Sequence, residues 1–390
     1  MIDKQLQAYR KYQRFIKTIL TVTGCWYMPT KSGKSTYYWP ICVLLLMNVY
    51  LILILHTTYV FRHNLVNMMK MTGVAISSIS AIIKVTTFMV HRKSLKNCHR
   101  ILSDFFEEEL TQNKQIRRIM FSSLRATYTM AYAYFIILIS LISGYAAPPI
   151  ISMIRDLCHL RLTTNYNLPV GRGHLYFWTV PDNLLYHLHF FYELTQTSLS
   201  SMLACAIESV FGFYTYLFAS TVRVMIFRLT NPLPTDKFSD VLKMCIKKHQ
   251  KLLKCRDTLE RVFGPIVLWH VVSNSILLCS LIYETVNMEF SFANITVIVP
   301  YSSIKLLQMF IYAQYGTVLT NASDDFRKGI YFSEWPNSDL DCHVKTNVIL
   351  MLMQKPMTIY AIFSPVEMIM FTNVINTTMS YFFLLRSKDG

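Results

Sequence analysis

The sequence is poor in charged residues, and this scarcity excludes most soluble classes of protein. Only 15% of its 390 residues are charged, whereas about a quarter are charged in a typical soluble domain. Hydrophobic residues make up 53% of the chain, and the mean hydropathy is +0.33. No hydrophilic stretch is long enough to fold by itself. The composition argues against a soluble enzyme, a disordered protein and a secreted disulfide scaffold, and it predicts one membrane domain over residues 1–390.

The sequence also lacks the motifs of metal, redox and nucleotide chemistry. Its nine cysteines include no Cys-x-x-Cys pair, and its eleven histidines lack the spacing that metal ligands need. The stretch Gly171-Arg172-Gly173 has no third glycine and no strand–helix context, so it is not a phosphate-binding loop. We therefore expect no enzymatic activity, no bound metal and no cofactor.

Long apolar segments dominate what is present. A transmembrane helix needs about 20 mainly apolar residues. Seven segments meet this length, at residues 39–60, 68–90, 127–151, 189–227, 263–286, 293–319 and 357–385. The predicted fold class is an all-α membrane protein with seven transmembrane helices, in contact with membrane lipid.

Lysine and arginine are distributed unequally between alternate loops. With the N-terminus placed in the cytoplasm, the inner stretches hold 29 of the 38 basic residues and the outer stretches hold 7. Basic loops stay on the cytoplasmic side of a membrane. The sequence therefore predicts a cytoplasmic N-terminus and an extracellular C-terminus, the opposite of a G-protein-coupled receptor. The same distribution accounts for the formal charge of +16 without binding to nucleic acid.

The longest outer loop, residues 152–188, is rich in aromatic residues and proline, among them Trp178 and Pro181. Such a loop is typical either of a folded lid over the helices or of an aromatic belt at the membrane surface. The sequence leaves both interpretations open.

Two lysines interrupt the apolar segments. Lys84 lies in the second segment and Lys305 in the sixth. An unpaired ammonium group inside a membrane is costly, so each is expected to face water or a partner, for which Glu208 is a candidate. We favour a structural polar contact over an ion pathway, because isolated charges do not make a pathway.

The last segment carries a polar stripe. Five residues follow one another at spacings of 4, 3, 4 and 3, which place them on one face of a helix. They are Asn373, Thr377, Ser380, Leu384 and Ser387. If several copies surrounded an axis, this stripe would line a wet pore, and Leu384 would form a hydrophobic gate. Packing between helices through small residues gives the same pattern.

The second, third and fourth segments combine apolar, hydroxyl and aromatic residues in their outer halves. A mostly apolar pocket with a few hydroxyl groups suits a small volatile or lipophilic ligand, although plain helix packing is an alternative. The candidate ligand-binding residues are Thr72, Ala75, Ile76, Ile79, Ile139, Ser143, Tyr145, Tyr192, Gln196, Leu199 and Ser200.

Two stretches carry a resemblance to a known family. The chain ends its last segment in Thr-Thr-Met-Ser-Tyr-Phe-Phe-Leu-Leu at 377–385, and Leu168-Pro169, Trp178 and Pro181 precede the fourth segment. With the seven segments and the inner N-terminus, these features resemble the insect odorant receptors, specifically an odorant-tuning subunit.

The resemblance implies a function and an assembly. It implies a ligand-gated, non-selective cation channel of four subunits that includes an odorant co-receptor, in the plasma membrane of olfactory sensory neurons. A small volatile odorant would bind in the outer half of the helices, and the last helix of each subunit would line the pore. Leu384 would be the gate, Ser387 would form a polar ring outside it, and residues 335–354 would form a cytoplasmic anchor helix.

The sequence leaves three other functions open. A gustatory-type channel would work as a homomer, but its Gln-containing ending is not matched here. A metabotropic seven-helix receptor would need the opposite orientation. A small-solute transporter would need broken helices and paired charges in the membrane, of which Lys84, Lys305 and Pro365 are the only hints.

Overall fold

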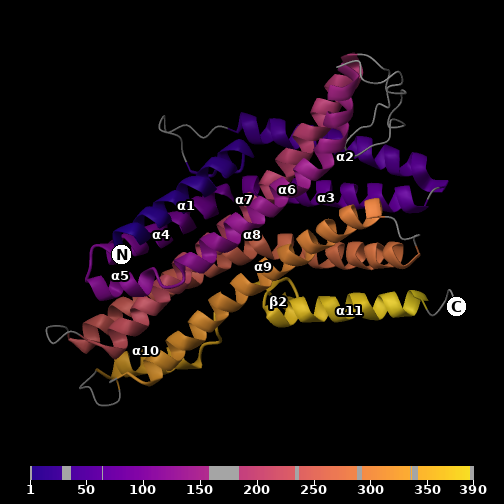
Figure 1. Cartoon of the computed structure of the whole chain (residues 1–390). Coiled ribbons are helices and arrows are strands. Elements are labelled where there is room, and N and C mark those ends of the chain that lie inside the picture. Colours follow the sequence, from indigo (N-terminus) through magenta and orange to yellow (C-terminus); the bar gives the residue numbers. More distant parts are fainter. Residues whose placement is uncertain are drawn as a thin grey trace.

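The computed structural model describes residues 2–28, 37–63, 65–157, 184–232, 237–287, 292–333, 335 and 341–386. Within these ranges the chain is almost entirely helical, and long helices run side by side along one axis (Figure 1). The outer loop considered as a lid, at 152–188, lies outside the described residues from 158 to 183.

Each of the seven apolar segments holds one long helix. Five helices in the described ranges are apolar and long enough to cross a membrane. The helices on the seven segments are α2 (Tyr38–Val60), α3 (Leu65–Val90), α6 (Leu124–Leu157), α7 (Leu184–Thr230), α8 (Phe238–Asn287), α9 (Phe292–Tyr331) and α11 (Met368–Arg386).

Helix α7 forms the centre of the molecule. It packs against α9 along much of its length and also contacts α6, α3 and α8. Leu203, Val210 and Leu217 have no exposed surface. This burial follows from the sequence, because a helix that is apolar on all sides has no face to give to water.

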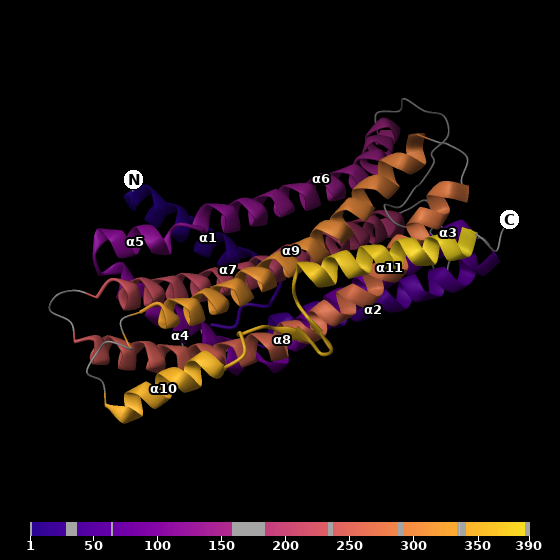
Figure 2. The same cartoon turned by 90° about the horizontal axis from the view of Figure 1, so that it is seen from below.

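Four further helices gather at the end of the molecule that holds the N-terminus, and the C-terminus lies at the other end (Figures 1 and 2). They are α1 (Ile2–Val22), α4 (Arg92–Leu110), α5 (Lys114–Met120) and α10 (Cys342–Met353). The apolar segments did not predict α1, whose overall character is polar. It is amphipathic, and it buries Tyr12, Ile16 and Leu20 against α7 and its neighbours.

Two helices extend far beyond their apolar segments. Helix α8 begins at Phe238 rather than 263, and α9 continues to Tyr331 rather than 319. Both extensions run toward the N-terminal end of the molecule (Figure 2). The helix expected at 335–354 is shorter than expected, since α10 begins at Cys342 and contacts α9.

The last helix begins later than expected. The segment 357–385 was expected to be helical throughout, but α11 begins at Met368. Extended backbone and a hairpin of β1 (Tyr360–Ala361) and β2 (Ser364–Pro365) precede it. Pro356 and Pro365 explain the difference, because proline lacks the backbone donor and disfavours helix in the residue before it.

Side chains on α9 accept the hydrogen bonds of this extended segment. The backbone N–H of Met357 donates to Ser323 Oγ at 2.9 Å, and that of Met368 donates to Thr317 Oγ1 at 3.0 Å. The segment is thereby fixed to α9 immediately before α11 begins.

Candidate functional site

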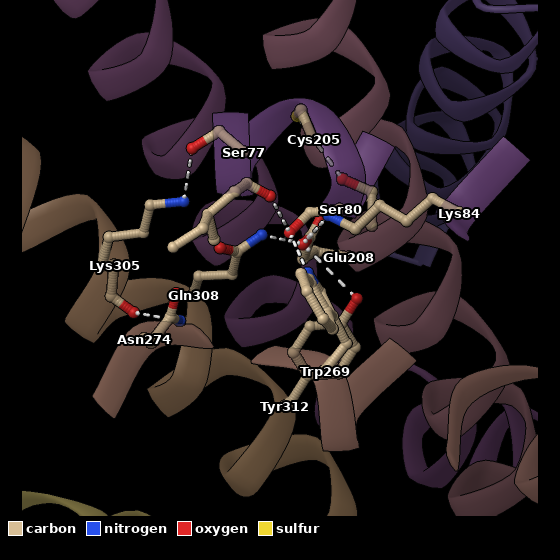
Figure 3. A network of polar contacts seen from close by, with 12 residues as sticks. Ser77, Ser80, Lys84, Cys205, Glu208, Trp269, Asn274, Lys305, Gln308 and Tyr312 are labelled. Atoms are coloured by element: carbon tan, nitrogen blue, oxygen red, sulfur yellow. Dashed lines mark hydrogen bonds and ion pairs between the residues drawn. The ribbon is translucent and has the colours of Figure 1, made fainter. Parts of the chain in front are cut away.

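Polar side chains of α3 and α9 come together inside the bundle, where Ser77 on α3 bonds to Tyr301 and Lys305 on α9. Each of the two helices carries a set of polar residues at spacings of three and four, so each set shares one helix face. The set on α3 is Ser77, Ser80 and Lys84, and the set on α9 is Tyr301, Lys305, Gln308 and Tyr312. Helix α7 contributes Glu208 to the same region, and α8 contributes Trp269, His270, Ser273 and Asn274. Together these residues form the buried polar cluster, most of which Figure 3 shows.

Glu208 is the acceptor at the centre of the cluster. Its Oε1 receives Lys84 Nζ at 2.8 Å, Gln308 Nε2 at 2.5 Å and Tyr312 Oη at 3.4 Å. Lys84 and Glu208 are only 2% and 1% exposed. The expected pairing with Glu208 is therefore present for Lys84, and this ion pair joins α3 to α7 inside the bundle.

Lys305 has different partners. Its ammonium donates to Ser77 Oγ at 3.1 Å and lies 5.4 Å from the centre of the Tyr301 ring. Ser77 and Tyr301 are joined through their hydroxyl groups at 3.1 Å. Among the described residues no carboxylate lies within 4.0 Å of Lys305 Nζ, and the residue is 7% exposed. With Lys84 neutralising Glu208, the buried polar cluster keeps one positive charge.

Several buried polar atoms of the cluster lack a hydrogen-bond partner within the described chain. They are Glu208 Oε2, both ring nitrogens of His270, Ser273 Oγ and Asn274 Oδ1. Buried polar atoms are nearly always paired in folded proteins. A cluster with several unpaired acceptors and donors is therefore suited to hold a polar group from outside the chain.

Two of the candidate ligand-binding residues pack against α2. Ala75 forms a small apolar cluster with Tyr50 and Ile54, and Tyr192 packs against it. Tyr192 Oη also donates to the carbonyl oxygen of Leu46 at 3.1 Å. These contacts provide each side chain with a structural role at the α2–α3–α7 contact, and ligand binding by them stays a prediction.

The remaining candidates occupy different environments. Gln196 and Leu199 are buried on α7, and Gln196 Oε1 has no hydrogen-bond partner among the described residues. Ile139 and Ser143 are exposed on α6, so the chain itself does not enclose them. Four more are half-buried, namely Thr72, Ile76, Ile79 and Ser200. The side chain of Tyr145 lies outside the described part of the structure.

The polar stripe of the last segment lies on the open face of α11. Asn373, Thr377 and Ser380 are exposed, and Asn376, which the stripe did not include, is exposed beside them. The side chains of Leu384 and Ser387 lie outside the described residues, so the gate and the outer ring stay predictions.

The opposite face of α11 is packed against the chain. Its buried residues are Met370, Val374, Thr378 and Phe382, and the helix contacts α8 and α9. Helix α11 is thus held on one side and free on the side that carries the polar stripe, at the lower edge of the molecule in Figure 1.

Sequence reasoning missed most of the buried polar cluster. It identified Lys84, Lys305 and Glu208 as charges within apolar segments, but not Ser77, Tyr301, Gln308 or the polar residues of α8. The signal that was available is the shared spacing of Ser77, Ser80 and Lys84 on one segment and of Tyr301, Lys305 and Gln308 on another.

Comparisons with known proteins place these features in one family. The model of the 7tm odorant receptor family matches residues 64–379. Odorant receptor 9a of Drosophila melanogaster is 22% identical over 334 residues, which cover 82% of this chain and 81% of the relative. Odorant receptor 49a of the same species is 22% identical over 297 residues, covering 73% and 71%. The odorant receptor coreceptor of Anopheles gambiae is 22% identical over 145 residues, covering 37% and 30%.

Solved structures show the same fold. The insect olfactory receptor OR5 from Machilis hrabei superposes with a TM-score of 0.79 at 13% identity, over 97% of this chain and 98% of that chain. Its complex with eugenol also gives a TM-score of 0.79, covering 98% and 99%. The family match spans most of the sequence, and the fold agrees over nearly the whole chain, so this protein belongs to the 7tm odorant receptor family.

Proposed function

We propose that this chain is the odorant-tuning subunit of a ligand-gated, non-selective cation channel. The observation that carries the proposal is the placement of α11, which packs one face on α8 and α9 and leaves Asn373, Thr377 and Ser380 exposed. A polar stripe on the free side of a membrane helix needs a polar environment. Four such helices around an axis would provide one.

The proposed partner is an odorant co-receptor, in a channel of four subunits. The coreceptor of Anopheles gambiae is itself a relative of this chain, which supports assembly through equivalent surfaces. Helix α10 would join the subunits on the cytoplasmic side, and Leu384 and Ser387 would form the gate and the outer ring. This arrangement needs a cytoplasmic N-terminus in the plasma membrane of an olfactory sensory neuron, as the distribution of basic residues predicts.

The proposed ligand is a small volatile molecule. The solved relative binds eugenol, which supports a ligand of this size. The ligand would enter from the outer half of the bundle and contact α3, α6, α7 and α8 or α9, near the candidate residues Ile76, Gln196 and Leu199. Binding there would be coupled to α11 through α9, which contacts both α7 and α11.

Whole-cell recording tests the channel assignment. Cells would express the chain with or without an odorant co-receptor and receive a panel of volatiles while G-protein signalling is blocked. We expect fast cation currents only in the presence of the co-receptor. Currents without it would instead indicate a gustatory-type homomer, and currents that vanish with the block would indicate a metabotropic receptor.

Cysteine accessibility tests the pore stripe. We expect a cationic methanethiosulfonate reagent to reduce the current of Ser380→Cys by more than about half, since a positive charge in a narrow cation pore blocks conduction. Met379→Cys is the matched control, because Met379 is the neighbouring residue, is 39% exposed and lies off the stripe. Equal effects at both positions would contradict the assignment of this face to the pore.

A further inference from the structure

Among the described residues, the charge of the buried polar cluster is not balanced. Lys84 is paired with Glu208 at 2.8 Å. The Lys305 ammonium instead contacts the hydroxyl group of Ser77 and the ring of Tyr301, and among the described residues no carboxylate lies within 4.0 Å of it. An ammonium group has three N–H donors, and Ser77 uses one of those on Lys305. A buried charge without a counter-ion is unfavourable unless a charged or strongly polar group meets it.

The neighbouring groups suit an anion with an attached apolar part. Ser77 and Tyr301 place two hydroxyl groups beside the Lys305 ammonium, and Tyr301 Oη also donates to the carbonyl oxygen of Gly73 at 3.2 Å. Gly73 has no side chain, and the atoms nearest to the position of an added Cβ are Leu277 Cδ2 and Tyr301 Oη, both at 3.5 Å. Leu277 is 4% exposed. Polar donors and an apolar surface therefore lie next to each other where α3, α8 and α9 meet.

We propose that this part of the buried polar cluster binds the carboxylate of a small organic acid, with the free N–H groups of Lys305 as the main donors. The alkyl chain would lie along Gly73 and Leu277. The inference rests on the proposed function, because it names the chemical class of odorant that the receptor takes. A charge-assisted hydrogen bond is about twice as strong as a neutral one, so the site would prefer an acid to the alcohol of the same length.

A binding experiment on the purified full-length chain tests this class without relying on channel currents. The probes are straight-chain carboxylates of about four to eight carbons and the matching alcohols at pH 7.5, and the readout is the shift in melting temperature with ligand concentration. We expect saturable stabilisation by at least one carboxylate, with an apparent Kd at least about tenfold lower than that of its alcohol. No stabilisation by any acid, or equal affinity for acid and alcohol, would overturn the proposal.

Variants assign the preference to Lys305. We expect Lys305→Met to remove most of the difference between acid and alcohol, and Lys305→Arg to retain part of it. Lys93→Met is the matched control, since Lys93 is exposed on α4, and it should leave both affinities unchanged. An unchanged preference in Lys305→Met would overturn the role of this lysine.

A milder variant covers the case in which Lys305→Met does not fold. Tyr301→Phe keeps the ring beside the ammonium and removes one hydroxyl group. We expect it to weaken carboxylate binding by about threefold or more with little effect on the alcohol, and equal weakening of both would contradict the proposed site. The two proposals can fail separately. If cells that express the chain with the co-receptor gave currents only to neutral volatiles, the channel proposal would hold and the proposed class of ligand would be wrong.

Discussion

At the residue scale, the pair of Lys84 and Glu208 has the clearest consequence. Both side chains are almost completely buried, and Gln308 adds a third group to the same carboxylate oxygen. Breaking a buried ion pair by removing one partner costs about 3–5 kcal/mol, whereas replacing both partners can be nearly neutral. The pair therefore makes the packing of α3 on α7 specific, even if it contributes little net stability.

We expect Lys84→Met to destabilise the protein by about 3–5 kcal/mol, because Glu208 would keep a buried charge without its counter-ion. Thermal unfolding in detergent, together with the amount of protein at the cell surface, would measure the loss. The double variant Lys84→Met, Glu208→Gln should recover most of it. If Lys84→Met were as stable as the natural protein, the pair would not be needed to hold α3 on α7.

At the element scale, the position of α11 depends on the segment that precedes it. That segment lies so close to α9 that a Cβ at Gly316 would overlap the carbonyl oxygen of Val366, and one at Gly264 on α8 would lie 2.8 Å from the carbonyl oxygen of Tyr360. Gly316 on α9 and Gly264 on α8 therefore leave room for the same stretch of backbone, residues 360–366. They set how closely α11 approaches α8 and α9.

We expect Gly316→Ala to displace the extended segment and to reduce stability by about 1–3 kcal/mol, the usual cost of overpacking. Ligand-evoked currents should fall by more than protein at the surface, because α11 is the proposed pore helix. Gly144→Ala is the matched control, since Gly144 is also helical and nothing lies within 4 Å of an added Cβ there. If Gly316→Ala left both the stability and the ligand-evoked currents unchanged, the segment would be free to move away from α9.

At the scale of the whole molecule, a chain of hydrogen bonds ties the N-terminal region to the centre. Tyr214 on α7 donates to Tyr27 Oη at 2.6 Å, and Tyr27 lies 3.1 Å from His99 Nδ1 on α4. Because Tyr214 is the donor in the first contact, the Tyr27 hydroxyl is free to donate to a neutral His99. Burial lowers the pKa of His99 to about 4.

This arrangement predicts acid sensitivity. Between pH 6.5 and about 4 the unfolded chain binds a proton at His99 that the folded chain does not, so stability falls as the pH decreases through this range. We expect the titration of His99 to lower the free energy of unfolding by about 2 kcal/mol at pH 5 relative to pH 7.5. Unfolding of the natural protein and of His99→Gln at the two pH values would measure it.

The variant His99→Gln should show the smaller decrease, because glutamine keeps an acceptor but does not titrate. His343→Gln is the control, since His343 is exposed on α10, and it should behave like the natural protein. Equal decreases in the natural protein and in His99→Gln would show that His99 is not a source of the pH dependence.

The sequence by itself determined the class and the approximate helices. Apolar length predicts helices because backbone polar groups in a membrane must be satisfied within the segment, and the observed α2 (Tyr38–Val60) differs from the expected 39–60 by a single residue. Spacing along one helix also placed Asn373, Thr377 and Ser380 on a common face. These properties are local, so they can be read from neighbouring residues.

The tertiary structure decided what depends on contacts between distant residues. Hydropathy missed α1, because its apolar face is narrow and is buried only once α7 is present. Hydropathy also predicted a helix across Pro365. In the structure this segment is not helical, and side chains of α9 accept hydrogen bonds from backbone N–H groups on both sides of Pro365. The buried polar cluster joins four helices. No pattern along one of them shows that Lys84 is paired with a carboxylate, while Lys305 has a hydroxyl partner and no carboxylate among the described residues. Pairing depends on distance in space, which spacing in the sequence does not fix.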